Sequence, residues 1–407
     1  MNHLETAATA AIFLSTYIVI AIGRLPGFRI DRAGAALVGG SLMLAIGAVS
    51  LDDLGKAIDF PTLALLLGLM IVVGHLRLSG FFGLVNTWIV TRARHPLQLL
   101  AAVIFSAGVF SAFLLNDAIC LVMTPLVADI ARRLRRDPLP YLLGVAMASN
   151  VGSTATITGN PQNILIGSFS GLSYGRFAAA LSPVAAVGLV LTFLVVWLTH
   201  RAEFRRDGGF AAEPLPAAAD QAHMVKSLTV TVAMVVAFFA GVAPAEAALV
   251  AGGAMLLTRN LPSERIYHEI DWPLLLMFAG LFVVVAGFEK ALLTPETVAR
   301  VGGLHLDSVP VLSVVAAGLA NIVSNVPAVL VLKPFVNALA DPQRAWLTVA
   351  MASTLAGNLT ILGSVANLIV VQGARQHGVT IGFWAYFRVG APLTVLTILV
   401  GVCWLSR

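Results

Sequence analysis

The chain has 407 residues, of which 58% are hydrophobic and only 11% are charged, with a formal net charge of +5. A soluble domain carries roughly 25% charged residues, so this composition excludes a soluble globular protein and predicts an integral membrane protein. Two isolated cysteines exclude a disulfide framework. The sequence contains no GxxxxGK[ST] motif, so it gives no sign of an ATP site. The histidines have no carboxylate or nucleophile at catalytic spacing, so the sequence does not indicate an enzyme.

Apolar runs of about 20 residues recur along the chain and predict an all-α polytopic membrane protein. In the first half, helices are expected over residues 8–24, 33–49, 60–76, 97–134 (two short runs), 139–170 (interrupted) and 177–199. In the second half, they are expected over 225–243, 245–258, 272–289, 308–340 (again two short runs), 345–374 (again interrupted) and 382–405. Amphipathic segments near 79–95 and 291–305 are expected to lie at the membrane interface.

The two halves of the chain repeat the same punctuation in the same order. Ile58-Asp59-Phe60-Pro61 matches Ile270-Asp271-Trp272-Pro273 at an offset of 212, and Ala146-Met147-Ala148-Ser149 matches Ala350-Met351-Ala352-Ser353 at an offset of 204. Shared composition does not explain matches in a fixed order, so we interpret them as a duplication. The expected organisation is a first repeat over 1–200, a cytoplasmic linker over 201–223 and a second, inverted repeat over 224–407.

The basic residues predict how the chain is oriented in the membrane. Arginines at 92–94 and at 132–136 flank the two runs that meet at Asn116-Asp117, which places both ends of that pair on the cytoplasmic face. The pair is therefore expected to be a re-entrant hairpin, and each repeat to have about five spans. With this threading, 17 of the 25 lysines and arginines fall in cytoplasmic loops and six in outer loops. This distribution is an orientation signal and not a footprint for nucleic acid.

Polar residues gather at the two hairpin tips and the two interrupted spans. Irregular backbone at membrane depth persists only where it is buried in protein or lines a site, and paired interruptions are typical of secondary transporters. Asparagine supplies an amide donor and a carbonyl acceptor without burying a charge. The predicted substrate-binding residues are Asn116, Ser149, Asn150, Thr154, Asn163, Ser324, Asn325, Asn358, Ser364 and Asn367. Capping of the hairpins and close helix packing by small residues are the structural alternatives for this enrichment.

Asp117 is the only acid expected deep in the membrane, where an ionisable residue suggests a functional role. We therefore expect it to carry a proton or a coupling cation, although a structural pairing with hairpin N–H groups is the alternative. Asn116, Asn325, Gly159 and Gly363 complete the predicted coupling site. Lys333 has two open interpretations, either meeting an anionic substrate or extending to the outer surface.

Three motifs resemble those of the ion transporter superfamily, which includes arsenite-efflux permeases, divalent-anion/sodium symporters, citrate transporters and sodium/proton antiporters. Asn116-Asp117-Ala118 and Asn325-Val326-Pro327 are similar to the first and second hairpins of the arsenite permeases. Gly159-Asn160-Pro161-Gln162-Asn163 is similar to the Gly-x-Pro-x-Asn of the symporter and citrate branches. The resemblance covers essentially the whole chain. It implies an elevator-type carrier, usually dimeric, with substrate between the tips and the breaks and with sodium at Asn116 and Asn325.

The sequence thus predicts a multi-pass inner-membrane secondary transporter of a small anion, such as arsenite, a dicarboxylate or citrate. The coupling gradient is either protons or sodium, and a sodium/proton antiporter of the same superfamily is the alternative. Expected partners are the anionic substrate, membrane lipid and a second copy of the chain. A soluble ATPase is a further option because the arsenite branch can associate with one. Neither nucleic acid nor any cofactor besides sodium ions is expected.

Overall fold

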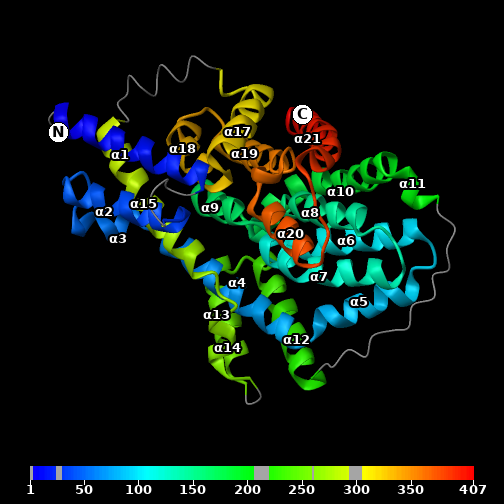
Figure 1. The fold of residues 1–407 in the computed structure, drawn as a ribbon. Helices are drawn as coiled ribbons and strands as arrows, with labels where there is room; N and C mark the ends of the chain where they lie inside the picture. The colour runs from blue at the N-terminus through cyan, green and yellow to red at the C-terminus, as the bar shows by residue number, and fades with distance from the viewer. Residues whose placement is uncertain (1–2, 24–29, 206–219, 259–260, 293–304) are drawn as a thin grey trace.

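The computed structural model describes residues 3–23, 30–205, 220–258, 261–292 and 305–407 (Figure 1). The helices of the first half are α1 (His3–Ile22), α2 (Arg32–Ala45), α3 (Leu51–Ala57), α4 (Phe60–Leu78), α5 (Phe81–Arg92), α6 (Pro96–Phe113), α7 (Asn116–Arg133), α8 (Pro138–Ser153), α9 (Pro161–Ser170), α10 (Tyr174–Thr199) and α11 (Arg201–Phe204). Those of the second half are α12 (Gln221–Phe239), α13 (Pro244–Leu256), α14 (Ser263–Tyr267), α15 (Trp272–Leu292), α17 (Val309–Val323), α18 (Asn325–Asn337), α19 (Pro342–Ala356), α20 (Val365–Gln376) and α21 (Phe383–Leu405).

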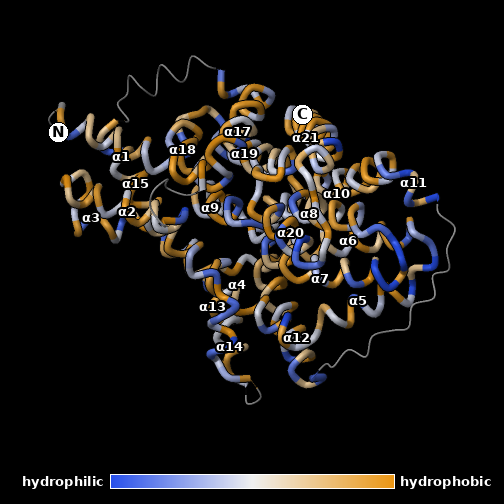
Figure 2. Tube along the Cα trace, in the orientation of Figure 1, coloured by the Kyte–Doolittle hydropathy of each residue, from blue (hydrophilic) through white to orange (hydrophobic). Residues whose placement is uncertain are grey.

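Seven of the described helices, namely α1, α4, α6, α10, α12, α15 and α21, are 18 to 26 residues long and apolar enough to cross a membrane. Shorter apolar helices, α2, α13 and α17, accompany them. Hydrophobic residues cover most helices, whereas hydrophilic residues gather near α11 and α14 (Figure 2). The protein is therefore an all-helical, multi-span membrane protein, as the composition predicts.

The helix boundaries differ from the expected ones mainly at two places. The segment expected to be a linker, 201–223, contains α11 and the first residues of α12, whose N-terminus the Asp220 carboxylate caps at the backbone N–H of His223. The amphipathic segment near 79–95 forms α5, and most of the one near 291–305 lies outside the described residues.

Aspartates start two of the long helices, α4 and α15, in the same way. The Asp59 carboxylate accepts a hydrogen bond from the backbone N–H of Thr62 at 3.3 Å, and Asp271 accepts one from Leu274 at 3.0 Å. A side-chain acceptor at this position satisfies one of the N–H groups that a helix leaves unpaired at its start. Asp59 and Asp271 therefore cap α4 and α15, each ahead of an aromatic residue and a proline.

The helices pack in two groups. The crossing group comprises α1–α4 and α12–α15, and the hairpin group comprises α6–α10 and α17–α21; the main packing partners of these helices lie in their own group. In Figure 1 the crossing group occupies the left and bottom of the molecule, and the hairpin group the right and top. Contacts between the groups are fewer, and α5 lies against both of them.

Two glycines let backbones of the crossing group touch. A Cβ placed on Gly68 of α4 would lie 2.5 Å from the backbone of Ala248 in α13, and one on Gly280 of α15 would lie 2.5 Å from the backbone of Ala36 in α2. The two crossings are equivalent, because Gly68 and Gly280 are 212 residues apart and so are Ala36 and Ala248. This is the offset found in the sequence. Small residues at membrane helix crossings generally permit such close approach.

Replacing Gly68 or Gly280 with alanine should therefore lower stability. Neither contact can be relieved by rotating a side chain, and overpacking of this kind costs about 1–3 kcal/mol. Gly253→Ala is the matched control, because a Cβ on this α13 residue meets nothing within 4 Å. Thermal unfolding of the detergent-solubilised protein would measure the effect. A Gly68→Ala midpoint as high as that of Gly253→Ala would contradict the proposed contact.

Candidate functional site

The chain leaves helical geometry at two equivalent places in the hairpin group. After α8 and after α19 it forms a short 3-10 turn, at Ile157–Gly159 and at Ile361–Gly363. One extended residue then follows, Asn160 in the first interruption and Ser364 in the second, before α9 and α20 begin. Gly159 and Gly363 pack against the backbones of Ser153 and Gly357, and a Cβ on either glycine would lie within 3 Å of that backbone.

One asparagine ties each interruption together. The Asn163 amide donates to the carbonyls of Ser153 and Thr156, both at 3.0 Å. The Asn367 amide donates in the same pattern to Gly357 and Thr360, at 2.7 and 3.1 Å. Carbonyls at the end of a helix have no partner within it, and lipid supplies none. Both predicted substrate-binding asparagines are fully buried and satisfy backbone groups.

Asn150 of α8 links the two interruptions and the first hairpin tip. Its amide donates to the side-chain oxygens of Asn358 and Asn367, both at 2.9 Å. Its own side-chain oxygen accepts from the Asn116 amide and from the Ser364 hydroxyl, each at 3.1 Å. One buried asparagine therefore fixes the position of side chains that belong to α7, α20 and the turn after α19.

The two hairpin tips present asparagine oxygens that have no hydrogen-bond partner. Asn116 and Asn325 begin α7 and α18, and the side-chain oxygen of each is buried and unpartnered among the described residues. The tips differ in backbone geometry, because Ser324 has a φ of 76° whereas Leu115 has an ordinary φ of −49°. A buried carbonyl oxygen without a partner costs free energy, so both tips favour a ligand that donates hydrogen bonds or is a cation.

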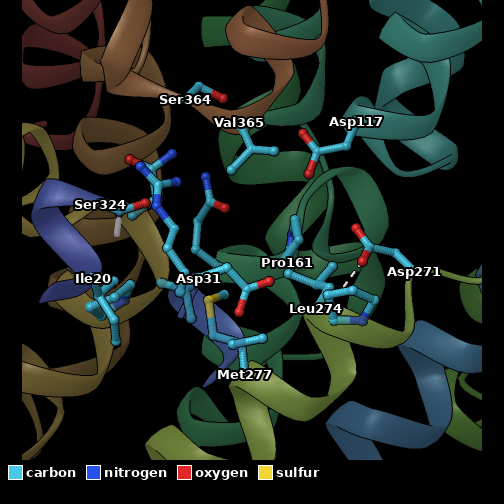
Figure 3. A pocket seen from close by; sticks show the side chains of 18 of the residues that line it. Ile20, Asp31, Asp117, Pro161, Asp271, Leu274, Met277, Ser324, Ser364 and Val365 are labelled. Carbon is cyan, nitrogen blue, oxygen red and sulfur yellow. Dashed lines mark hydrogen bonds between the residues drawn. The ribbon is translucent and has the colours of Figure 1, made fainter. Parts of the chain in front are cut away.

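A cavity of about 280 Å³ lies between the two helix groups, next to both tips. Figure 3 shows the carboxylate of Asp117 directed toward this space, with Ser364, Ser324, Asp31 and Asp271 around it. The hairpin group contributes Asn116, Asp117, Pro161, Gln162, Ser324, Asn325, Val326, Pro327, Ser364 and Val365. The crossing group contributes Ile20, Gly23, Asp31, Arg32, Ala33, Asp271, Pro273, Leu274 and Met277.

Carboxylates outnumber basic groups in the lining. Asp31, Asp117 and Asp271 face the cavity, and Arg32 is the only basic residue among its described lining. Asp31 and Asp271 each cap a helix of the crossing group, while Asp117 lies in the first turn of α7. The backbone of Ala366 interacts with the Asp117 carboxylate. The wall from the hairpin group thus offers amides, hydroxyls and the Asp117 carboxylate, and the wall from the crossing group offers two carboxylates and one guanidinium.

The predicted site residues fall into two sets. Asn116, Asp117, Ser324, Asn325 and Ser364 line the cavity. The others are buried behind it, namely Ser149, Asn150, Thr154, Asn163, Asn358 and Asn367, each at most 1% exposed, and the glycines of the two interruptions, Gly159 and Gly363. Arg32, Asp31, Gln162 and Asp271 also line the cavity, although none of them is among the predicted site residues. Gln162 and Asp271 belong to motifs that the sequence singles out, whereas Asp31 and Arg32 do not.

Asn150→Ala should lower the stability of the protein. It removes the partners of four side chains, and each buried polar group left unsatisfied costs about 1–3 kcal/mol. Ser227→Ala is the matched control, because its buried hydroxyl has no partner among the described residues. Thermal unfolding in detergent would compare the two variants. Equal unfolding midpoints would show that the amide network does not hold the interruptions together.

The chain is similar to known proteins along most of its length. The family model described as "Citrate transporter" matches residues 17–356. The chain is 29% identical to the silicon efflux transporter LSI3 of Oryza sativa subsp. japonica, over 93% of each chain. It is 28% identical to the inner membrane protein YbiR of Escherichia coli, over 85% of this chain and 87% of that one.

A solved structure has a related fold. The YdaH transporter of Alcanivorax borkumensis superposes with a TM-score of 0.62 at 15% identity, over 99% of this chain and 97% of that one. These findings confirm the resemblance to the ion transporter superfamily and indicate a membrane transporter and not an enzyme. Because the family model covers most of the residues, the chain belongs to the citrate transporter family.

Proposed function

We propose that this protein is an elevator-type secondary active transporter of a small oxygen-rich anion, driven by the proton gradient. The substrate would bind in the cavity between the two helix groups, in contact with Asn116, Ser324, Asn325 and Ser364. Arsenite, a dicarboxylate or citrate fits this class, in line with the family description. The Oryza relative is named as a silicon efflux transporter, which is also consistent with a small solute.

The observation that carries this proposal is the pair of unpartnered asparagine oxygens at the two tips. Both residues line one cavity that the hairpin group and the crossing group enclose together. Hydroxyl groups of a protonated oxyacid would donate to these oxygens, and the Ser324 hydroxyl would donate to an oxygen of the substrate. Movement of one group against the other would expose such a cavity alternately to the two sides, as in carriers built from repeats.

The same proposal includes two inverted repeats with re-entrant tips in a cell inner membrane. The paired glycine crossings and the paired asparagine ties support the duplication, since each recurs at its sequence offset. The arginine-rich loops support the orientation, and the name of the Escherichia coli relative supports the location. With this threading, the cavity opens on the cytoplasmic side, because Gly23 after α1 and Asp31 before α2 line it.

Asp117 would couple transport to protons. Its carboxylate lies in the cavity beside the substrate residues Asn116 and Ser364. A charged carboxylate would repel an anion there, whereas the protonated form would donate a hydrogen bond to it. Binding of the anion and binding of the proton would therefore favour each other, which is the condition for moving both together.

A sodium/proton antiporter is the second candidate, and the charge of the cavity favours it. Three carboxylates and one guanidinium line the space, which suits a cation better than a multiply charged anion. Asparagine oxygens are also suitable ligands for sodium, at Asn116 and Asn325. In this case Asp117 would exchange a proton for the cation without any anion.

Asn116→Leu and Asn325→Leu should each strongly reduce transport while leaving membrane insertion intact. Each change removes at least one hydrogen bond to the substrate, worth about 1–3 kcal/mol, which corresponds to about a 5- to 150-fold loss of affinity. Asn86→Leu is the matched control, because this buried α5 asparagine also has an unpartnered oxygen but does not line the cavity. Wild-type uptake or efflux in both tip variants would remove the proposed site.

Proteoliposomes with a pH-sensitive dye trapped inside would separate the two candidates. We expect a pH change that requires an added anion when arsenite, citrate, succinate and sulfate are tested in turn. Asp117→Asn should abolish this pH change while retaining anion binding, because the amide keeps the shape of the side chain but cannot release a proton. A pH change driven by sodium alone would instead establish the antiporter.

A further inference from the structure

A second cavity, of about 670 Å³, lies between the same two helix groups. Helix α18 connects the two cavities, since Asn325 at its start lines the first and Lys333 near its end lines the second. Phe169 and Leu330 also come from the hairpin group, and the rest of the lining belongs to α3, to α15 and to the chain around them up to the start of α4. With the predicted threading, this cavity faces the outer side of the membrane.

An ion pair joins the two groups inside the second cavity. The Lys333 ammonium lies 3.3 Å from the carboxylate of Glu289, which belongs to α15 in the crossing group. It also lies 5.0 Å from the centre of the Phe169 ring, in its own group. Each of the two charged side chains is about 30% exposed, so water reaches the pair and can replace either partner.

A second ion pair in the same cavity lies within a single group. Lys290 of α15 is 3.4 Å from the carboxylate of Asp53 in α3, and both helices belong to the crossing group. The two pairs therefore share the cavity, the chemistry and the neighbouring positions 289 and 290 of one helix. They differ in whether relative movement of the two groups would separate the partners.

A further contact between the groups lies along the same helix. The Tyr17 hydroxyl of α1 donates to the carbonyl of Pro327 in α18 at 3.4 Å. The crossing group thus holds α18 near its start through α1 and near its end through α15. Of these two contacts, only Lys333–Glu289 is an ion pair. If the two groups separated, both of its side chains would become solvated ions.

We propose that Lys333 and Glu289 form the outer gate of the carrier and favour the conformation in which the first cavity is open. This inference rests on the proposed function, because it requires the two groups to move against each other. Separating the groups at the second cavity breaks this pair but leaves Lys290–Asp53 intact. A pair of such exposure changes an equilibrium by at most about fivefold, which suits a gate that must open in every cycle.

Labelling of a cysteine at position 365 would report the conformation directly. Val365 lines the first cavity and is 36% exposed there, so Val365→Cys should react with a maleimide only while that cavity is open. The native thiols, Cys120 and Cys403, are replaced first. Purified protein in lipid nanodiscs gives the reagent access to both faces, so the labelling rate depends on conformation and not on orientation.

Lys333→Met and Glu289→Gln should each lower the labelling rate, by at most about fivefold. Exchanging the two charges in one protein, E289K with K333E, should restore the rate, which a merely misfolded variant would not do. The controls Lys290→Met and Asp53→Asn should label like the parent. Raised salt should slow labelling of the parent by screening the pair but leave Lys333→Met unchanged.

Two results would overturn the gate. The first is an unchanged labelling rate in both single variants, and the second is an equal decrease in the Lys290 and Asp53 controls. Transport by the native protein in proteoliposomes tests the proposed function separately. A native protein that moves neither anions nor cations refutes that function, whereas the labelling rates still decide whether the pair controls opening of the first cavity.

Discussion

The structure depends on satisfying backbone polar groups where helices stop inside an apolar protein. Two helices of the hairpin group break at equivalent places, and lipid offers nothing to the carbonyls that the breaks release. Asn163 and Asn367 each donate to two of these carbonyls. Without such donors these carbonyls would be buried without partners, which would destabilise both interruptions.

The amide network that supports the breaks also determines what remains free for a ligand. Asn150 binds side chains from both interruptions and from the first tip, so the donors of Asn116 and Ser364 point inward to the protein. The side-chain oxygens of Asn116 and Asn325 have no partner among the described residues, which leaves them as acceptors for a ligand. The preference of the site for hydrogen-bond donors thus follows from the way the hairpin group is held together.

Much of the architecture could be predicted because it depends on local sequence patterns. Apolar run length located the long helices to within a few residues, and Gly-Asn-Pro punctuation located the interruption before Pro161. The lining by Arg32, Asp31 and Asp271 could not be predicted in the same way, because these residues meet Asp117 only through the packing of distant helices. Likewise, polarity at Asn163 and Asn367 indicated a break, but whether each amide faces a ligand or the backbone depends on coordinates.

The glycine crossings have a mechanical meaning. Where α4 meets α13 and α2 meets α15, backbone packs directly against backbone, so no side-chain rotamer change can accommodate a displacement. Closely packed interiors resist compression and transmit displacement over their length. A displacement of α15 would therefore move α2 with it, so the crossing group behaves as a stiff frame. Such a frame allows the weaker contacts along α18 to yield first when the molecule changes shape.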